Sequence, residues 1–134
     1  MNAMRLEGQN FVAIDAPSDA QVQQKVRALW SAGKHSYASL TDDGGSYVQV
    51  AGGRATCMVE RFEAATGKRW RAFHDKPSPV FPDGTLLVFG AGEVALKSDE
   101  WFVADAVLEI FLCFKAARPY PATVSWRAAE GSSA

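Results

Sequence analysis

The chain has few of the features that mark secreted, membrane-spanning or redox-active proteins. Its 134 residues contain two cysteines, Cys57 and Cys113, and no C-x-x-C pair of the kind that zinc sites and redox motifs require. No segment approaches the roughly 18 to 20 apolar residues that cross a bilayer, and the first residues lack the apolar core of a signal peptide. We therefore expect a cytoplasmic protein without a membrane partner, in which both cysteines are buried free thiols.

Net charge and histidine are also scarce. Lys and Arg number 14 against 15 Asp and Glu, which gives a formal net charge of -1. Nucleic-acid binders normally carry an excess of positive charge, so we expect no nucleic-acid partner. The two histidines, His35 and His74, lack the H-x-H, H-x-x-x-H or H-x-x-E spacing that preorganises metal ligands. We expect no metal, no cofactor and a structural or surface role for each histidine.

Composition and length predict one folded domain with a real core. The 48% share of hydrophobic residues is enough to offset the entropy of ordering the chain, and 22% of residues are charged. A chain of this length is too short for a barrel enzyme or a two-lobed nucleotide enzyme. We expect a single domain over residues 1–134, with flexible ends at 1–10 and 128–134.

Two segments have the pattern of helices. Ser18 followed by Gln21 forms a capping box, and Val22 begins an apolar stripe of helical spacing that we expect to end at Gly33. The second helix is predicted over Asp99–Ala116, with Ser98 as its cap, and is the most apolar segment of the chain.

The remaining segments alternate as strands do and are joined by short turns rich in Gly and Asp. Val48 and Val50 are expected to point into the core, with Gln49 pointing out. The continuously apolar segment 85–89 is typical of a strand covered on both faces. The predicted strands are 11–16, 36–41, 46–51, 54–63, 68–74, 85–89, 93–97 and 123–127. The fold class is therefore α+β, an antiparallel meander-type sheet with two main helices packed mostly on one face.

The sequence Phe89-Gly90-Ala91-Gly92 has the first two glycines of a dinucleotide-binding fingerprint. No third glycine follows at Ala95, and the next residues predict a strand where a phosphate-binding helix would have to begin. A turn or bulge explains these glycines better than a nucleotide site does.

Charge is segregated along the chain despite the neutral total. Residues 54–76 carry a net charge of about +3 and residues 83–109 about -5. We expect Arg61, Arg69 and Arg71 to project together, with Trp70 on the opposite face of its strand. Such a cluster would recognise carboxylates or phosphates. The alternative is a solvated sheet face on which these arginines pair with nearby glutamates.

The apolar helix predicted over Asp99–Ala116 has two interpretations. It is either enclosed by the fold, or its outer apolar residues dock a partner or a second copy of the chain, which would make a homodimer. Asp105 and Glu109 lie one turn apart on it, a spacing more typical of a solvated stripe than of a catalytic acid pair. We expect no catalytic residues.

Three segments resemble small immunity proteins of bacterial contact-dependent and polymorphic toxin systems. They are Ser46–Gly53, Pro82–Thr85 and Asp99–Phe102. The resemblance implies a curved sheet with a helix behind it and stoichiometric inhibition of a toxin. It carries over no functional residue. The near-neutral charge differs from the strongly acidic character of many nuclease-neutralising members, which argues against a nuclease as the toxin.

The favoured function is therefore a non-enzymatic, protein-binding domain that inhibits a cognate toxin. The expected partner-binding residues are Arg61, Arg69, Trp70 and Arg71. The alternative is a small enzyme or ligand-binding protein whose pocket lies between the sheet and the helix 99–116, within reach of Cys57 or His74.

Overall fold

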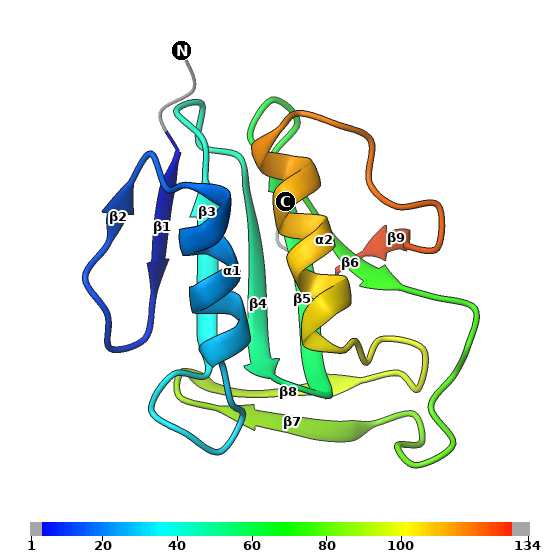
Figure 1. The fold of residues 1–134 in the computed structure, drawn as a ribbon. Helices are drawn as coiled ribbons and strands as arrows, with labels where there is room; N and C mark the ends of the chain where they lie inside the picture. Colours follow the sequence, from blue (N-terminus) through cyan, green and yellow to red (C-terminus); the bar gives the residue numbers. More distant parts are fainter. Residues whose placement is uncertain (1–3, 130–134) are drawn as a thin grey trace.

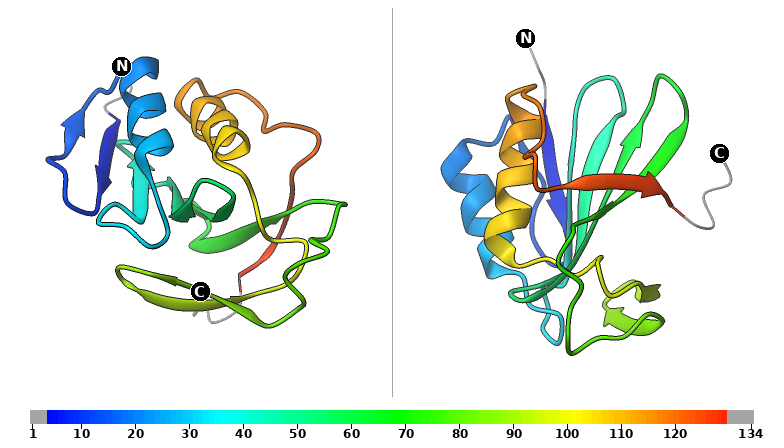
Figure 2. Two further views of the ribbon diagram at one scale, coloured as in Figure 1. Left: turned by 60° about the horizontal axis from the view of Figure 1, so that its bottom comes forward. Right: turned by 90° about the vertical axis from the view of Figure 1, so that its right-hand side faces the viewer.

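Two helices lie on one face of a seven-stranded antiparallel sheet, and a two-stranded hairpin lies on the other face (Figures 1 and 2). This is a computed structural model, which describes residues 4–129. The large sheet has the strand order β2-β1-β3-β4-β5-β6-β9, and β7 and β8 form the separate hairpin. The elements are β1 (Arg5–Gly8), β2 (Ile14–Asp15), α1 (Asp19–Ala28), β3 (Tyr37–Thr41), β4 (Tyr47–Gly53), β5 (Thr56–Glu63), β6 (Lys68–Phe73), β7 (Thr85–Phe89), β8 (Gly92–Leu96), α2 (Ala104–Lys115) and β9 (Ser125–Ala128). The α+β class and the antiparallel meander of β3 to β6 are confirmed.

Both expected flexible ends contribute strands where the structure describes them. Arg5–Gly8 forms β1 and pairs with β3, and its Leu6, opposite Leu40, is completely buried. The strand expected at 11–16 is reduced to the two residues of β2. Ala128 ends β9 and lies opposite Trp70. Residues 1–3 and 130–134 of the expected ends lie outside the described residues.

Helix α1 begins as the capping box predicts and ends sooner than expected. The Ser18 hydroxyl accepts a hydrogen bond from the Gln21 amide at 3.1 Å, and the Gln21 side chain accepts one from the Ser18 amide at 2.9 Å. The helix stops at Ala28, because Leu29 is extended, with ψ 142°, and enters the core. Gly33 lies in the following turn and does not cap the helix.

Helix α2 begins at Ala104, five residues later than predicted, and Val103 is its N-cap. The segment before it is extended, because Phe102 exchanges two backbone hydrogen bonds with Cys57, at 2.8 and 3.0 Å. Asp99 and Glu100 therefore do not lie in the first turn of a helix. Their carboxylates bind arginines of the sheet instead, as described below. No helix in the described part of the chain is long and apolar enough to span a membrane.

Two apolar clusters hold the layers together. The larger one fills the space between the helices and the sheet, and Phe111, Ile110 and Leu40 are completely buried in it. The smaller one joins the hairpin to the opposite face of the sheet through Ala51, Met58, Leu87, Leu96 and Trp101. At about 25 cal/mol per Å² of apolar surface removed from water, burial of this kind is the main stabilising contribution.

The expectation that both faces of residues 85–89 are covered is wrong. Leu87 is buried against the sheet, but Leu86 and Val88 on the other side of β7 are 51% and 60% exposed. The hairpin has one covered face because it lies at the surface of the molecule and is not a strand pair inside the large sheet.

Candidate functional site

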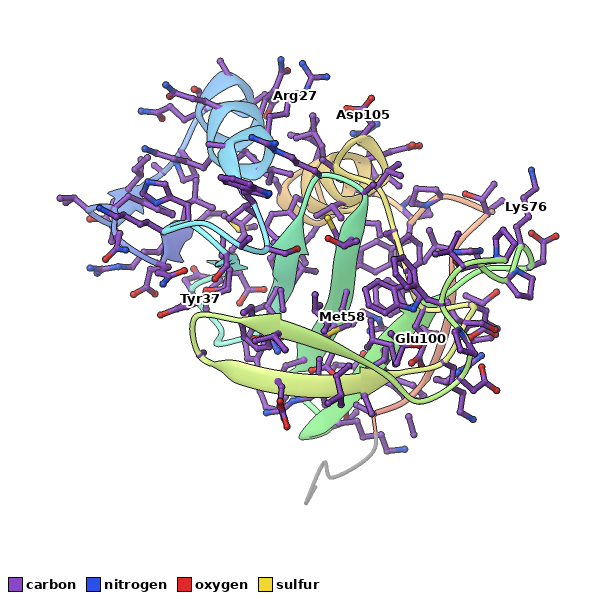
Figure 3. The ribbon with its side chains drawn as sticks, turned by 90° about the horizontal axis from the view of Figure 1, so that it is seen from below. Arg27, Tyr37, Met58, Lys76, Glu100 and Asp105 are labelled. Carbon is purple, nitrogen blue, oxygen red and sulfur yellow. The ribbon has the colours of Figure 1, made fainter. Side chains whose placement is uncertain are left out.

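The face of the large sheet opposite the helices carries a groove of about 530 Å³ that the turn of the β7–β8 hairpin bounds. Figure 3 shows two of its lining residues, Tyr37 and Met58, beside the hairpin. Strands β1, β3, β4 and β5 form its floor. The lining residues are Glu7, Gly8, Tyr37, Ala38, Ser39, Gln49, Val50, Ala51, Met58, Phe89 and Ala91. We call this hollow the sheet groove.

Aromatic and polar side chains share the sheet groove. Tyr37 and Phe89 meet edge to face, with ring centroids 6.2 Å apart, where β3 passes the hairpin. Ser39 and Gln49 are directly opposite each other on β3 and β4, so both project from the same face. Their hydroxyl and amide groups and the aromatic rings suit hydrogen bonding and packing against another molecule.

A buried ion-pair network lies next to the sheet groove on the same face. The Arg71 guanidinium donates from Nε and Nη2 to Oε2 of Glu60, at 3.0 and 2.8 Å. Its Nη1 donates to Glu100 at 3.5 Å and to the Ala95 carbonyl at 3.3 Å. Gln49, which lines the groove, donates to the second oxygen of Glu60 at 3.1 Å. The network therefore holds one side chain of the groove in position.

Arg127 of β9 completes this network. It makes two hydrogen bonds to Asp99, at 3.1 and 2.8 Å, and one to Glu100 at 3.4 Å. Its guanidinium also lies 3.9 Å from the centroid of the Phe73 ring. Asp99 and Glu100 lie in the connection between β8 and α2. Arg71 and Arg127 therefore attach this connection to the open face of the sheet, the face opposite the helices. A basic residue of segment 54–76, Arg71, thus pairs with an acidic residue of segment 83–109, Glu100.

An aromatic pair lies towards the other end of the open face. Tyr47 and Phe62 are opposite each other on β4 and β5, and their rings stack with centroids 5.3 Å apart. Arg69, opposite Phe62 on β6, donates to the Tyr47 hydroxyl at 3.3 Å. These three side chains extend the mixed aromatic and polar surface beyond the sheet groove.

The four predicted partner-binding residues do not form one cluster. Arg69 and Arg71 share the open face, as their alternation predicts, but Arg71 is buried in the ion-pair network and presents no free guanidinium. Arg61 lies directly opposite Trp70 on β5 and β6, so both lie on the helix face. The expected grouping of Arg61 with Arg69 and Arg71 is therefore wrong.

Arg61 is surrounded by aromatic rings of its own chain. Its guanidinium carbon lies 4.9 Å from the ring centroid of Trp126, 5.5 Å from that of Trp70 and 5.6 Å from that of Tyr120. Burial raises the pKa of Tyr120, while Arg61 acts in the opposite direction. Cation–π contacts of this kind stabilise the end of the sheet beyond α2 and leave little of Arg61 for a partner.

The histidines make hydrogen bonds with backbone groups, and each reaches a residue distant in the chain. Nδ1 of His35 lies 2.9 Å from the Gln9 carbonyl oxygen. His74 has Nε2 2.7 Å from the Trp101 carbonyl oxygen and accepts from the Lys76 amide at Nδ1. Because Nδ1 accepts a hydrogen bond, Nε2 is the nitrogen that donates to the Trp101 carbonyl, and the two contacts position the ring between two chain segments.

Cys57 is poorly suited to act as a nucleophile. It is 1% exposed, and burial raises the pKa of its thiol to about 12. Cys113 is also a buried free thiol. Both cysteines are therefore the buried free thiols that the sequence predicted.

The space between the sheet and α2 is filled by side chains. Val107, Ile110 and Phe111 are completely buried there, whereas Asp105 and Glu109 are exposed. Most apolar side chains of α2 are thus buried within the fold. Asp105 pairs with Arg27 of α1 at 3.3 Å, and Figure 3 shows both residues.

A second hollow, of about 480 Å³, lies at the beginning of α2. It is lined by His74, Asp75, Lys76, Trp101, Phe102, Val103, Ala106, Thr123 and Val124. The alternative pocket was expected within reach of Cys57 or His74. His74 lines this hollow, whereas Cys57 does not. In the part of the chain that the structure describes, no three His, Cys, Asp or Glu side chains are grouped closely enough to hold a metal ion.

The sequence interpretation missed the sheet groove because its residues come from four strands and a separate hairpin. The alternation of β4 did indicate that Gln49 faces away from the helix-side core, where Val48 and Val50 are buried. No signal in the sequence placed Tyr37 against Phe89, since that contact depends on how the hairpin folds back across the sheet.

Comparison with known proteins adds no relationship to these observations: no protein-family model matches the chain, and no curated protein or solved structure matches it significantly.

Proposed function

We propose that this chain is a non-enzymatic protein-binding domain that inhibits a cognate bacterial toxin by stoichiometric binding, and that the toxin contacts the open face of the sheet. The observation that carries the proposal is the sheet groove, in which aromatic rings, a hydroxyl and an amide lie together on paired strands. Tyrosine and arginine side chains are enriched among the residues that dominate binding at protein interfaces.

The contact surface is revised from that expected from the sequence. Tyr37, Ser39, Gln49 and Phe89 form its centre, and Arg69 beside Tyr47 lies towards its margin. Arg71 does not contact the partner itself. It positions Glu60, which in turn positions Gln49. Because these side chains are already held in place in the free protein, binding a partner costs less conformational entropy.

The second candidate is a small enzyme or small-ligand-binding protein that uses the hollow at the beginning of α2. Its apolar lining and the neighbouring His74 and Lys76 favour this reading. The two functions use different surfaces, so variants of one surface distinguish them.

The test uses the toxin candidate encoded by the neighbouring open reading frame. Co-expression of the wild-type chain is expected to restore growth and to yield a complex with one copy of each protein. Ser39→Arg places a long cation on the floor of the sheet groove and is expected to weaken this complex by about a hundredfold, measured by isothermal titration calorimetry.

Val12→Arg is the matched control, since Val12 is 86% exposed in the connection between β1 and β2 and is not among the groove residues. It should bind as wild type does. Failure of the wild-type chain to bind the neighbouring protein, or equal binding by Ser39→Arg, would overturn the proposal. Turnover of a small molecule that a Val103→Arg change abolishes would support the second candidate instead.

A further inference from the structure

The hairpin strand β7 has one edge without a strand partner in the described part of the chain. It pairs with β8 along one side, and the two strands form a sheet of their own. β7 lies at the margin of the molecule (Figure 1). Its outer edge is therefore directed away from the large sheet.

The hairpin register shows which backbone groups lie on that edge. Gly90 and Ala91 form a two-residue turn that the Phe89–Gly92 pair closes. In such a hairpin the closing pair is hydrogen-bonded and the pairs alternate, so Leu86 and Val88 direct their N–H and C=O groups outwards. Ala95 lies opposite Leu86 in β8, so its backbone groups should also point away from the hairpin. Its carbonyl accepts a hydrogen bond from Arg71 and not from β7, as this pattern requires.

This edge lacks the features that usually protect a strand from pairing. β7 has the sequence Thr-Leu-Leu-Val-Phe, with no charge and no proline, whereas β2 at one edge of the large sheet has only two residues. Leu86 and Val88 are 51% and 60% exposed on the uncovered face of the hairpin. Uncharged strands with exposed alternate apolar residues are templates for pairing with another chain.

We propose that a second copy of this chain pairs antiparallel with β7 about a two-fold axis at Leu87, so that two hairpins form one four-stranded sheet. In that register Leu86 lies opposite the partner's Val88, and both residues direct their free backbone groups at each other. The exposed side chains of Leu86 and Val88 then meet those of the partner on one face. No like charges meet, because β7 carries none.

This self-association goes beyond toxin binding. It uses the backbone edge at Leu86 and Val88, neither of which lines the sheet groove, although Phe89 at the end of the same strand does. The contact is small, so the dimer is expected to be weak and dependent on concentration. It also differs from the homodimer expected through the helix 99–116, because most of the apolar residues of α2 are buried in the monomer.

The test measures molar mass by sedimentation equilibrium over about a thousandfold range of protein concentration. The wild-type mass should rise from 14.5 kDa towards twice that value. Val88→Lys should weaken association by about tenfold or more, because a lysine disfavours pairing at a strand edge and the two lysines lie diagonally across the axis on the same face. Leu86→Lys is a second variant with the same expected result.

Val12→Lys is the control, since it places the same charge at an exposed valine remote from the hairpin. Hydrogen exchange tests the proposed register between the two copies. The amides of Leu86 and Val88 should exchange more slowly as concentration rises, while the exchange rate of the Leu87 amide stays unchanged. A wild-type mass of 14.5 kDa at every concentration overturns the proposal. So does association that both lysine variants leave intact, or exchange of the two amides that does not depend on concentration.

Discussion

At the scale of single residues, Arg71 is important for stability, and its partners explain why. Its side chain is 10% exposed, and those of Glu60 and Glu100 are 8% and 3% exposed. Arg71 thus holds two carboxylates in a poorly solvated place. Arg127 also bonds Glu100, and Gln49 and the Lys97 amide satisfy other carboxylate oxygens. Removing a partner from a buried pair costs much more than the pair itself contributes, because a charge is left without compensation.

Arg71→Met keeps much of the side-chain volume and removes the charge. We expect the free energy of unfolding, measured by urea denaturation, to fall by about 3 kcal/mol or more. Arg5→Met is the matched control, since Arg5 is 55% exposed and its pairs with Glu7 and Asp15 are longer, at 3.9 and 3.8 Å. It should cost less than about 1 kcal/mol. Equal losses in the two variants would contradict the assigned role of Arg71.

Cys57 gives a prediction about pH. Because burial raises its pKa from 9.0 to about 12, the folded protein favours the protonated thiol. This contribution to stability is fully present below pH 9.0 and is lost as the pH rises towards 12. In a Cys113→Ala background, a thiol reagent at about pH 8 should label unfolded protein in urea rapidly and folded protein hardly at all. Equal labelling rates in both states would rule out the buried thiol.

At the scale of elements, the approach of β4 to the end of α1 depends on a glycine. A Cβ atom at Gly53 would lie 2.2 Å from the carbonyl carbon of Leu29 and 2.4 Å from the amide nitrogen of Trp30. Both are backbone atoms, which cannot move aside as a flexible side chain can. The strand and the helix end can approach so closely only because residue 53 has no side chain.

Gly53→Ala should therefore lower the free energy of unfolding by about 2 to 3 kcal/mol, measured by thermal or urea denaturation. Gly44→Ala is the control, because a Cβ there would meet one side-chain oxygen at 3.4 Å. We expect this change to stay within about 0.5 kcal/mol of wild type. A Gly53→Ala protein as stable as the control would mean that β4 and α1 are farther apart.

The same scale shows where prediction from the sequence succeeded and failed. The capping box of α1 and the alternation of β3 to β6 are local signals, and both were read correctly. The beginning of α2 was placed too early because Asp99 and Glu100 suit the first turn of a helix. In the structure the hydrogen bonds of Phe102 to Cys57 keep that segment extended, and no local pattern reveals them.

At the scale of the whole molecule, some of the opposite charges behind the near-neutral total pair with one another in the folded chain. Arg71 and Glu100 form a buried pair, Arg127 and Asp99 form a partly buried pair, and Arg27 pairs with Asp105 at the surface. The segregated charges of the sequence are therefore partly used to fasten the hairpin, β9 and the helices to one another. Aromatic and hydrogen-bonding groups are left to dominate the open face.

The sequence by itself determined the fold class, the start of α1 and the inward and outward residues of β4, because each depends on neighbours a few positions apart. The tertiary structure alone decided which arginines share a face, which of them is buried and where the groove lies. Those outcomes depend on the register between β5 and β6 and on the hairpin crossing the sheet, and contacts between residues distant in the chain set both.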